Sequence, residues 1–164
     1  MSEATDRMDL AFRAIVDKAP LVDFVMRRWG TSGMLIGMHR YDVKDLEATG
    51  LYLGDELVAF ANWTQRDRMI LICAVHSLRS GEGFARQLLE ELKRLARARG
   101  ATVLRAMASN DNLPALAFFQ LNGFRLTTLY VGAIDAFRGA MPGLISKGYR
   151  GIDVRDAIEL EFLL

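Results

Sequence analysis

Two glycines stand just before a helix-like apolar segment, in the stretch Leu78-Arg79-Ser80-Gly81-Glu82-Gly83-Phe84-Ala85. Small residues at this spacing let backbone N–H groups point together into a turn, and a helix start adds partial positive charge. The ligand that suits such a turn is a phosphate or pyrophosphate, to which Arg79 can add a charge-assisted contact. Taken alone, this glycine pattern is equally typical of a tight turn between a strand and a helix that binds no ligand.

The residues after the turn narrow the class of phosphate ligand. A P-loop has Lys and then Ser or Thr after its second glycine, whereas Phe84 and Ala85 follow Gly83 here. The dinucleotide fingerprint has a third small residue where Arg86 stands. The turn matches both motifs poorly. This counts against the alternative that the chain is a different kind of nucleotide-dependent enzyme that uses the same glycine turn.

A second motif follows downstream, within residues 110–124. It resembles the signature Asn-x-x-Ala-x-x-Phe-Tyr-x-x-x-Gly-Phe of the GNAT (Gcn5-related N-acetyltransferase) superfamily, which is matched by Asn112, Ala115, Phe118, Gly123 and Phe124. The glycine turn resembles the acetyl-CoA motif of the same superfamily, Arg/Gln-x-x-Gly-x-Gly/Ala, although its first position is Ser80 and Arg79 stands one residue early. With residues 151–161, the chain resembles an uncharacterised bacterial branch of that superfamily over nearly its whole length.

The resemblance implies acetyl-CoA as co-substrate, with no metal, and attack of an amine on the thioester. The pantetheine arm would pair with the strand at Cys73, Ala74 and Val75, where two parallel strands splay apart. A backbone donor on that strand would stabilise the developing oxyanion. The residues implied to bind the rest of the cofactor are Arg79, Ser80, Gly81, Glu82, Gly83, Phe84 and Ala85 at the pyrophosphate, and Asn112, Ala115, Phe118 and Phe119 on its other side.

Two departures concern proton transfer. Phe119 stands where the superfamily often has a tyrosine that protonates the leaving thiolate, so that general acid is missing. No Asp or Glu occurs between Met69 and Val75 to serve as general base. His76 is the titratable candidate at the end of this strand, although a lone histidine there more often only bonds a neighbouring loop.

The elements that must position these motifs follow from apolar periodicity. Residues 8–29 predict a pair of helices, the second starting at Pro20. Residues 34–41, 50–53, 57–64 and 68–76 predict an antiparallel meander. The segment from Phe84 to Gly100 predicts an amphipathic helix whose cations, from Lys93 to Arg99, form a solvated face, and residues 102–108 predict a strand parallel to 68–76.

The C-terminal third is predicted as a helix from Leu113 to Leu121 capped by Asn112, a strand over 124–131, a short helix near 134–140, a glycine-rich loop over 141–151 and a last strand over 158–164. In this last strand the alternation favours a solvated face for Glu159 and Glu161. The fold class is a mixed α/β sheet of the GNAT acyl-CoA N-acyltransferase type, an antiparallel N-terminal meander plus one central βαβ unit. We expect residues 1–164 to form one domain.

Composition excludes several classes of function. The chain has 164 residues, 51% of them hydrophobic, and 21 basic against 20 acidic side chains, so no net field favours nucleic acid or an anionic membrane. The lone Cys73 suits a reducing cytoplasm and rules out an internal disulfide. No apolar run approaches the ~20 residues that span a bilayer, and the N-terminus does not resemble a secretory signal.

The sequence therefore predicts a cytoplasmic N-acetyltransferase that transfers an acetyl group from acetyl-CoA to an amine of a small molecule or peptide. The alternative is a catalytically reduced CoA-binding module with a sensing or regulatory role, which the missing tyrosine at Phe119 keeps open. The last strand, taken as an end strand, could pair with a second copy in a homodimer.

Overall fold

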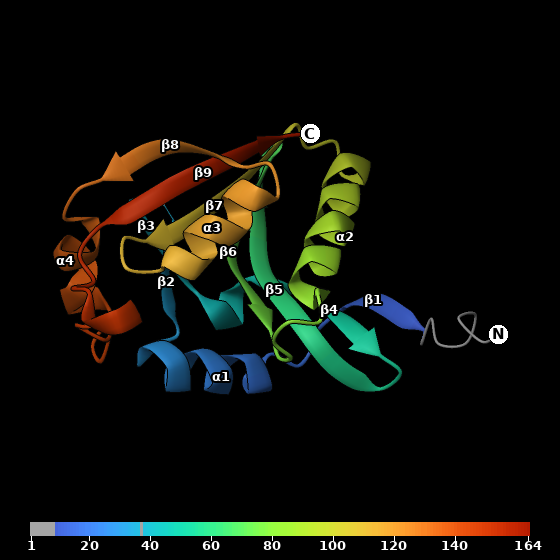
Figure 1. Ribbon diagram of the computed structural model, residues 1–164, viewed down its shortest axis with the longest axis horizontal. Coiled ribbons are helices and arrows are strands. Elements are labelled where there is room, and N and C mark those ends of the chain that lie inside the picture. The colour runs from blue at the N-terminus through green and yellow to red at the C-terminus, as the bar shows by residue number, and fades with distance from the viewer. Residues whose placement is uncertain (1–8, 37) are drawn as a thin grey trace.

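The computed structural model describes residues 9–36 and 38–164. Its centre is a seven-stranded sheet in the order β1-β4-β5-β6-β7-β9-β8 (Figure 1). Among the described residues, β6–β7 is the only parallel pair in this sheet, so the predicted mixed sheet is confirmed. The strands are β1 (Leu10–Ala14), β4 (Glu47–Leu53), β5 (Glu56–Arg66), β6 (Met69–Ser77), β7 (Val103–Ser109), β8 (Arg125–Tyr130) and β9 (Ala157–Leu163).

The first predicted helix is wrong, because Leu10–Ala14 forms the edge strand β1. It pairs antiparallel with β4, with Leu10 opposite Leu53 and Ala14 opposite Thr49. A segment this short gains little from helical hydrogen bonds alone, whereas the sheet satisfies its backbone and buries part of Phe12 in the core. Tertiary pairing therefore overrides the helix-like spacing of its apolar residues.

The second predicted helix is confirmed as α1 (Ala19–Trp29), with Pro20 in its first turn and Gly30 ending it at φ +74°. The predicted strand over residues 34–41 is corrected: it is a separate hairpin of β2 (Gly33–Ile36) and β3 (His39–Asp42), and Gly37 lies outside the described residues. A short 3-10 helix, η1 (Val43–Asp45), leads from it to β4.

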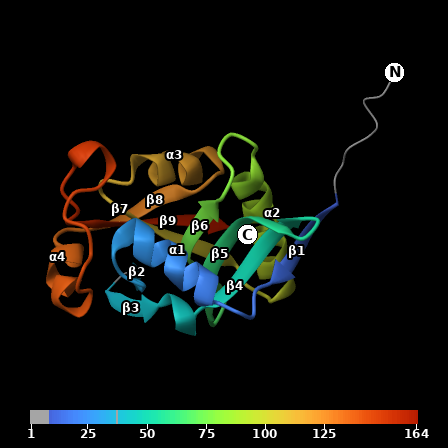
Figure 2. The same cartoon turned by 90° about the horizontal axis from the view of Figure 1, so that it is seen from below.

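Two layers of helix cover the sheet. On one face, α2 (Phe84–Ala98) and α3 (Leu113–Leu121) pack over β4 to β7 and β9 through buried leucines and phenylalanines. On the other, α1, β2 and η1 bury Leu21, Val25 and Met34 against Phe60 and Leu71. Figure 2 shows α1 crossing in front of the sheet. The predicted βαβ unit, β6-α2-β7, is confirmed by the parallel register from Met69 opposite Val103 to Ile72 opposite Ala106.

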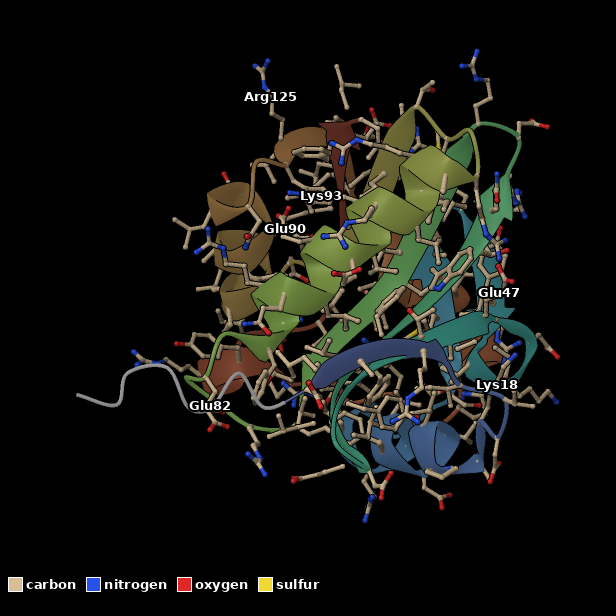
Figure 3. All side chains as sticks on the ribbon, turned by 90° about the vertical axis from the view of Figure 1, so that its right-hand side faces the viewer. Lys18, Glu47, Glu82, Glu90, Lys93 and Arg125 are labelled. Atoms are coloured by element: carbon tan, nitrogen blue, oxygen red, sulfur yellow. The ribbon has the colours of Figure 1, made fainter. Side chains whose placement is uncertain are left out.

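The predicted solvated face of α2 is wrong for Lys93, which is only 6% exposed. Its Nζ donates to Glu90 Oε1 at 2.8 Å and to the Asn122 carbonyl at 3.2 Å, and it lies 4.1 Å from the centre of the Phe162 ring. Figure 3 shows Glu90 and Lys93 on the same side of α2. Lys93 therefore ties α2 to the end of α3 and to β9, while its neighbour Arg94 is exposed.

The C-terminal strands correct two further expectations. β9 lies between β7 and β8 and is therefore not an edge strand; in the described part of the chain the two edges of the sheet are β1 and β8. Glu159 is only 3% exposed, because Tyr130 Oη donates to it at 2.9 Å, Thr127 Oγ1 donates at 2.9 Å and Arg105 Nε lies 3.4 Å away. The remaining short elements are α4 (Ala133–Phe137), η2 (Arg138–Ala140) and η3 (Tyr149–Gly151).

Within residues 9–36 and 38–164, no helix combines the length and apolar character needed to cross a membrane. The same residues contain no cluster of three or more His, Cys, Asp or Glu side chains placed to hold a metal ion.

Candidate active site

The site begins where β6 and β7 separate. Their last paired residues are Ile72 and Ala106. The register of β6 against β5 shifts at the same point, with Trp63 opposite Ile72 and Asn62 opposite Ala74, so Cys73 is an extra residue in β6. Such a bulge bends a strand and increases its twist. Figure 1 shows the two arrows diverging toward their carboxyl ends.

The separation leaves one backbone edge of β6 unpaired from Cys73 to His76 within the described chain. β7, by contrast, continues to pair with β9 as far as Ser109 opposite Ala157. A cavity of about 630 Å³ occupies the opening, with residues 73–76 on one wall and residues 107–109 on another. The unpaired edge can therefore accept an extended ligand in the manner of an added strand.

The glycine turn lies directly after this edge. Gly81 and Gly83 have φ of +78° and +76°, and a Cβ on either would meet no atom within 4 Å. Their backbone conformation, rather than space, is what favours glycine. α2 starts after Gly83 without a capping side chain, so the N–H groups of its first turn are free to bind an anion.

Arg79 is already paired in this structure. Its guanidinium contacts both carboxylate oxygens of Glu56, with Nε 3.2 Å from Oε1, and its Nη1 lies 3.9 Å from Glu82 Oε1. A phosphate at the turn would have to compete with these carboxylates for the guanidinium. Glu82 itself points outward at the start of α2 (Figure 3).

The structure brings most of the predicted cofactor-binding residues to one cavity but gives several side chains a packing role. Asn112 Oδ1 accepts from the Ala115 N–H at 3.3 Å and caps α3. Phe84 and Phe119 are buried in the core, and the Phe119 ring packs edge-to-face against Phe118 and at a tilt against Phe124. The predicted residues on the cavity wall are Cys73, Ala74, Val75, Ala85, Asn112, Ala115, Phe118 and Phe119, whereas Arg79, Ser80, Gly81, Glu82, Gly83 and Phe84 lie outside it.

His76 lies on the cavity wall in an aromatic environment. Its ring centroid is 4.9 Å from those of Phe24 and Phe60 and 5.1 Å from that of Trp29. It is 7% exposed, and burial, with a smaller contribution from the charge of Arg28, lowers its pKa to about 3. A neutral imidazole with so low a pKa is a weak proton acceptor, which counts against the predicted role of general base.

Cys73 is buried too, and burial raises the pKa of its thiol well above the usual range. The thiol therefore stays protonated at neutral pH and is a poor nucleophile. Cys73 therefore serves the site through the free backbone edge of β6 and not through its sulfur.

Asp111 is the residue of this site that the sequence analysis missed. It is 6% exposed, lies on the cavity wall and precedes the helix cap Asn112. Its Oδ2 accepts from the Tyr149 N–H at 3.0 Å, while Oδ1 has no partner among the described residues. A Cβ on Gly148 would fall 1.8 Å from Oδ2, so the loop approaches this closely only because that residue is glycine. An acidic residue beside the matched Asn112 was the available signal.

Another part of the cavity wall is apolar and comes from α1, β2, β7, α4 and the loop after η2. The hydrogen bonds that hold its loop include those of the Ile145 N–H to the Trp29 carbonyl at 3.2 Å and of Arg138 Nη1 to the carbonyls of Leu144 and Ile145 at 3.3 and 3.2 Å. The apolar side chains on this wall are Trp29, Met34, Leu35, Met107, Ile134, Met141, Leu144 and Ile145.

In this mixed sheet the parallel strands β6 and β7 separate beside a glycine turn and the start of a helix. This arrangement is typical of acyl-CoA-dependent transferases. The chain belongs to the acetyltransferase (GNAT) family, whose model matches residues 11–124. It is 28% identical over 138 residues to the uncharacterized protein YxbD of Bacillus subtilis, covering 84% of this chain and 87% of that protein.

Solved structures support the same fold. An IAA acetyltransferase from Bacillus cereus superposes with a TM-score of 0.72 at 16% identity, over 95% of this chain and all (100%) of that one. A GNAT family acetyltransferase from Elizabethkingia anophelis with acetyl-CoA bound gives a TM-score of 0.69 at 19% identity, over 94% of this chain and 98% of that one. The predicted superfamily and fold class are thus confirmed.

Proposed function

We propose that this protein is an N-acetyltransferase that transfers the acetyl group of acetyl-CoA to the amine of a small acceptor. The observation that carries the proposal is the opening of β6 from β7 after Ile72 and Ala106, which places an unpaired strand edge on a cavity wall beside the glycine turn. Acetyl-CoA bound to the Elizabethkingia anophelis relative supports this choice of co-substrate.

In the proposed complex the pantetheine arm lies along residues 73–76, and the pyrophosphate lies on the N–H groups at the start of α2. The acceptor nitrogen attacks the thioester carbonyl, an N–C bond forms and the C–S bond breaks. A backbone N–H on the free edge of β6 stabilises the oxyanion that develops on the carbonyl oxygen. Most of the acceleration comes from holding the two reactants together.

Proton transfer in this site uses water. Phe119 is a buried hydrocarbon ring, and His76 has a pKa of about 3. The leaving thiolate is already a good leaving group, because the pKa of a simple thiol is only about 8.5. The acceptor ammonium loses one proton to solvent before attack, and after attack water carries a second proton from the acceptor nitrogen to the leaving thiolate, so that CoA departs as the thiol. As argued for the lone Cys73, we place the activity in the cytoplasm.

Thermal denaturation with four ligands tests the co-substrate. Acetyl-CoA and CoA should raise the melting temperature in a concentration-dependent way, while ATP and NAD should not. A response to ATP or NAD without one to CoA would refute the proposal. Strong stabilisation by CoA without turnover of any amine would favour the non-catalytic CoA-binding module instead.

A further inference from the structure

We infer that Arg28 binds the carboxylate of the acceptor, and that the acceptor is an α-amino acid with an apolar side chain, whose amino group is acetylated. This inference rests on the proposed function and names the substrate class of the same cavity. It assigns the anchoring group and the attacking nitrogen to different atoms of the acceptor, so one group holds the molecule while the other reacts.

The cavity has walls on both faces of the sheet. On the face covered by α2 and α3, its wall includes Ala85 at the start of α2 and Phe118 of α3. On the opposite face, it includes Arg28 and Trp29 at the end of α1 and Met34 of β2. The glycine turn proposed for the pyrophosphate leads into α2, so the cofactor lies on the α2 face and the acceptor enters from the α1 face.

Three residues that are charged at neutral pH lie on the cavity wall, and two of them already have partners. The Asp111 carboxylate is buried and accepts from the Tyr149 N–H at 3.0 Å, and the Lys147 ammonium is ion-paired with Asp153. Arg28 is exposed and has no ion-pair partner in the part of the chain that the structure describes. Its guanidinium is therefore free to bind an anion, and a carboxylate matches its fork of N–H donors.

Arg28 also lies close to the part of the cavity where the reaction is proposed. Burial, and after it the positive charge of Arg28, lowers the pKa of His76 to about 3, so this charge acts on the end of the free edge of β6. In the proposed complex the pantetheine arm and its thioester lie along that same edge. A carboxylate held at Arg28 is thus near the attacking nitrogen, as in an α-amino acid, where a single carbon separates the two groups.

The apolar part of the wall explains the apolar side chain of the acceptor. It is formed by aliphatic side chains, one tryptophan and three methionines, Met34, Met107 and Met141. Methionine is flexible and polarizable, so such a wall adapts to apolar groups of different shape. A second charged group on the acceptor would meet these surfaces without a partner, which disfavours acidic and basic amino acids.

Arg28 also has a structural role that any test must separate from binding. Arg27 and Arg28 both lie in the last turn of α1, where cations favour the negative end of the helix dipole. Arg27 is exposed as well but is not on the cavity wall. The two arginines are therefore a matched pair, since both can stabilise the helix and Arg28 alone of the two lines the cavity.

Three acceptors with the same phenyl body test the substrate class. Phenylalanine carries the carboxylate, phenylalanine amide replaces it with a neutral group, and 2-phenylethylamine lacks it. As the amino nitrogen bonds to the acetyl carbon and the C–S bond breaks, phenylalanine gives N-acetylphenylalanine and CoA. We expect phenylalanine to have the highest kcat/KM with acetyl-CoA. An equal or higher value for either of the others, or absence of transfer to phenylalanine, leucine and methionine alike, would overturn the assigned class and leave the acetyltransferase proposal intact.

The variant Arg28→Gln tests the residue. We expect KM for phenylalanine to rise by about tenfold, the effect of losing a charge-assisted hydrogen bond, with KM for acetyl-CoA and for 2-phenylethylamine unchanged. Arg28→Lys keeps the charge but not the fork of donors, so it should restore part of the loss. Arg27→Gln should leave all three KM values unchanged. Equal effects of Arg27→Gln and Arg28→Gln, or an unchanged KM for phenylalanine in Arg28→Gln, would overturn the role.

Calorimetric titration of the protein with phenylalanine, in the presence of CoA, separates this inference from the proposed function. Binding to the native protein but not to Arg28→Gln, without acetyl transfer from acetyl-CoA, would support the carboxylate site and refute the enzyme. Acetyl transfer to amines that lack a carboxylate, without binding of phenylalanine, would support the enzyme and overturn the carboxylate site.

Discussion

Ile72 of β6 lies opposite Ala106 of β7, and in the described chain this is the last parallel pair before the two strands separate. The next residue, Cys73, is the extra residue of a β-bulge against β5. At this bulge, β6 thus stays paired with β5 while its backbone edge on the β7 side is unpaired. The candidate cofactor edge depends on this local defect more than on any single side chain.

The two ends of α2 offer a matched pair of glycines. Gly83 before the helix has φ +76° and Gly100 after it has φ +74°, and a Cβ on either meets open space. Substitution of either by Ala should destabilise the fold by about 1–2 kcal/mol, the cost of the left-handed conformation. Only Gly83→Ala should also weaken CoA binding, by about tenfold, because its turn presents the N–H groups.

Urea unfolding and CoA titration of the two variants measure these effects. Equal loss of CoA affinity in Gly100→Ala would show that the glycine acts through helix stability and not as part of an anion site. Unchanged affinity in Gly83→Ala would remove the turn from the cofactor site.

The lowered pKa of His76 predicts how the free energy of unfolding depends on pH. Its pKa is lowered to about 3 in the fold from 6.5. Between these values the unfolded chain binds a proton that the folded chain does not, so acidification destabilises the protein, by up to about 1.4 kcal/mol per pH unit from this group. In His76→Phe this contribution should vanish, and the loss of stability between pH 7 and pH 5 should be smaller.

The control is His39, which is exposed. His39→Gln should keep the pH dependence of the native protein. Equilibrium unfolding in urea at several pH values measures both variants. A native-like acid destabilisation in His76→Phe would contradict the burial-lowered pKa.

The pH–rate profile gives a separate test of catalysis by His76. The sequence-based hypothesis of a general base predicts that loss of His76 lowers activity most at acidic pH, where the acceptor is hardest to deprotonate. We instead expect the shape of the profile to be the same in His76→Phe and in the native protein, because a group with a pKa of about 3 does not titrate in the working range.

Lys93 and Arg94 are neighbours on α2 with opposite environments. Lys93 is buried and bonds Glu90 and Asn122, whereas Arg94 is exposed and pairs with Glu91 at 3.1 Å. Lys93→Met should destabilise the fold by about 1–3 kcal/mol because it leaves the Asn122 carbonyl without this donor. Arg94→Met should change stability by less than about 0.5 kcal/mol. Similar free energies of unfolding for the two variants would contradict the packing described for Lys93.

Gly148 should be intolerant of any side chain. A Cβ there would fall 1.8 Å from Asp111 Oδ2 and 3.1 Å from Val154 Cγ2. Gly148→Ala should therefore cost about 1–3 kcal/mol through overpacking. Gly139→Ala, where a Cβ meets nothing within 4 Å, should be close to neutral. Thermal unfolding of both variants decides the matter, and equal melting temperatures would contradict the tight approach of the loop to Asp111.

The sequence predicted the central parts of the fold because they are set by local patterns. The apolar stripe of α2, the cap at Asn112 and the proline at the start of α1 are short-range signals, and each is found as expected. The superfamily motifs added the co-substrate.

The errors come from long-range contacts. Leu10–Ala14 is a strand because β4 offers it partners 35 to 43 positions away in sequence, from the pair of Ala14 with Thr49 to the pair of Leu10 with Leu53. The sequence pattern predicted that the side chains of Lys93 and Glu159 face solvent. In the structure they are buried, and they bond Asn122 and Tyr130, which belong to elements distant in sequence. Asp111 was missed because the loop that covers it, around Gly148, has no periodic pattern that predicts its position.

Incubation of the protein with carbon-13-labelled acetyl-CoA and a panel of primary amines, followed by mass spectrometry, is the direct test of the proposed N-acetyltransferase activity. We expect a labelled N-acetyl product formed in equal amount with released CoA, at a rate that depends on amine concentration. CoA release without an acetylated amine, or tight CoA binding without any product across the panel, would contradict it.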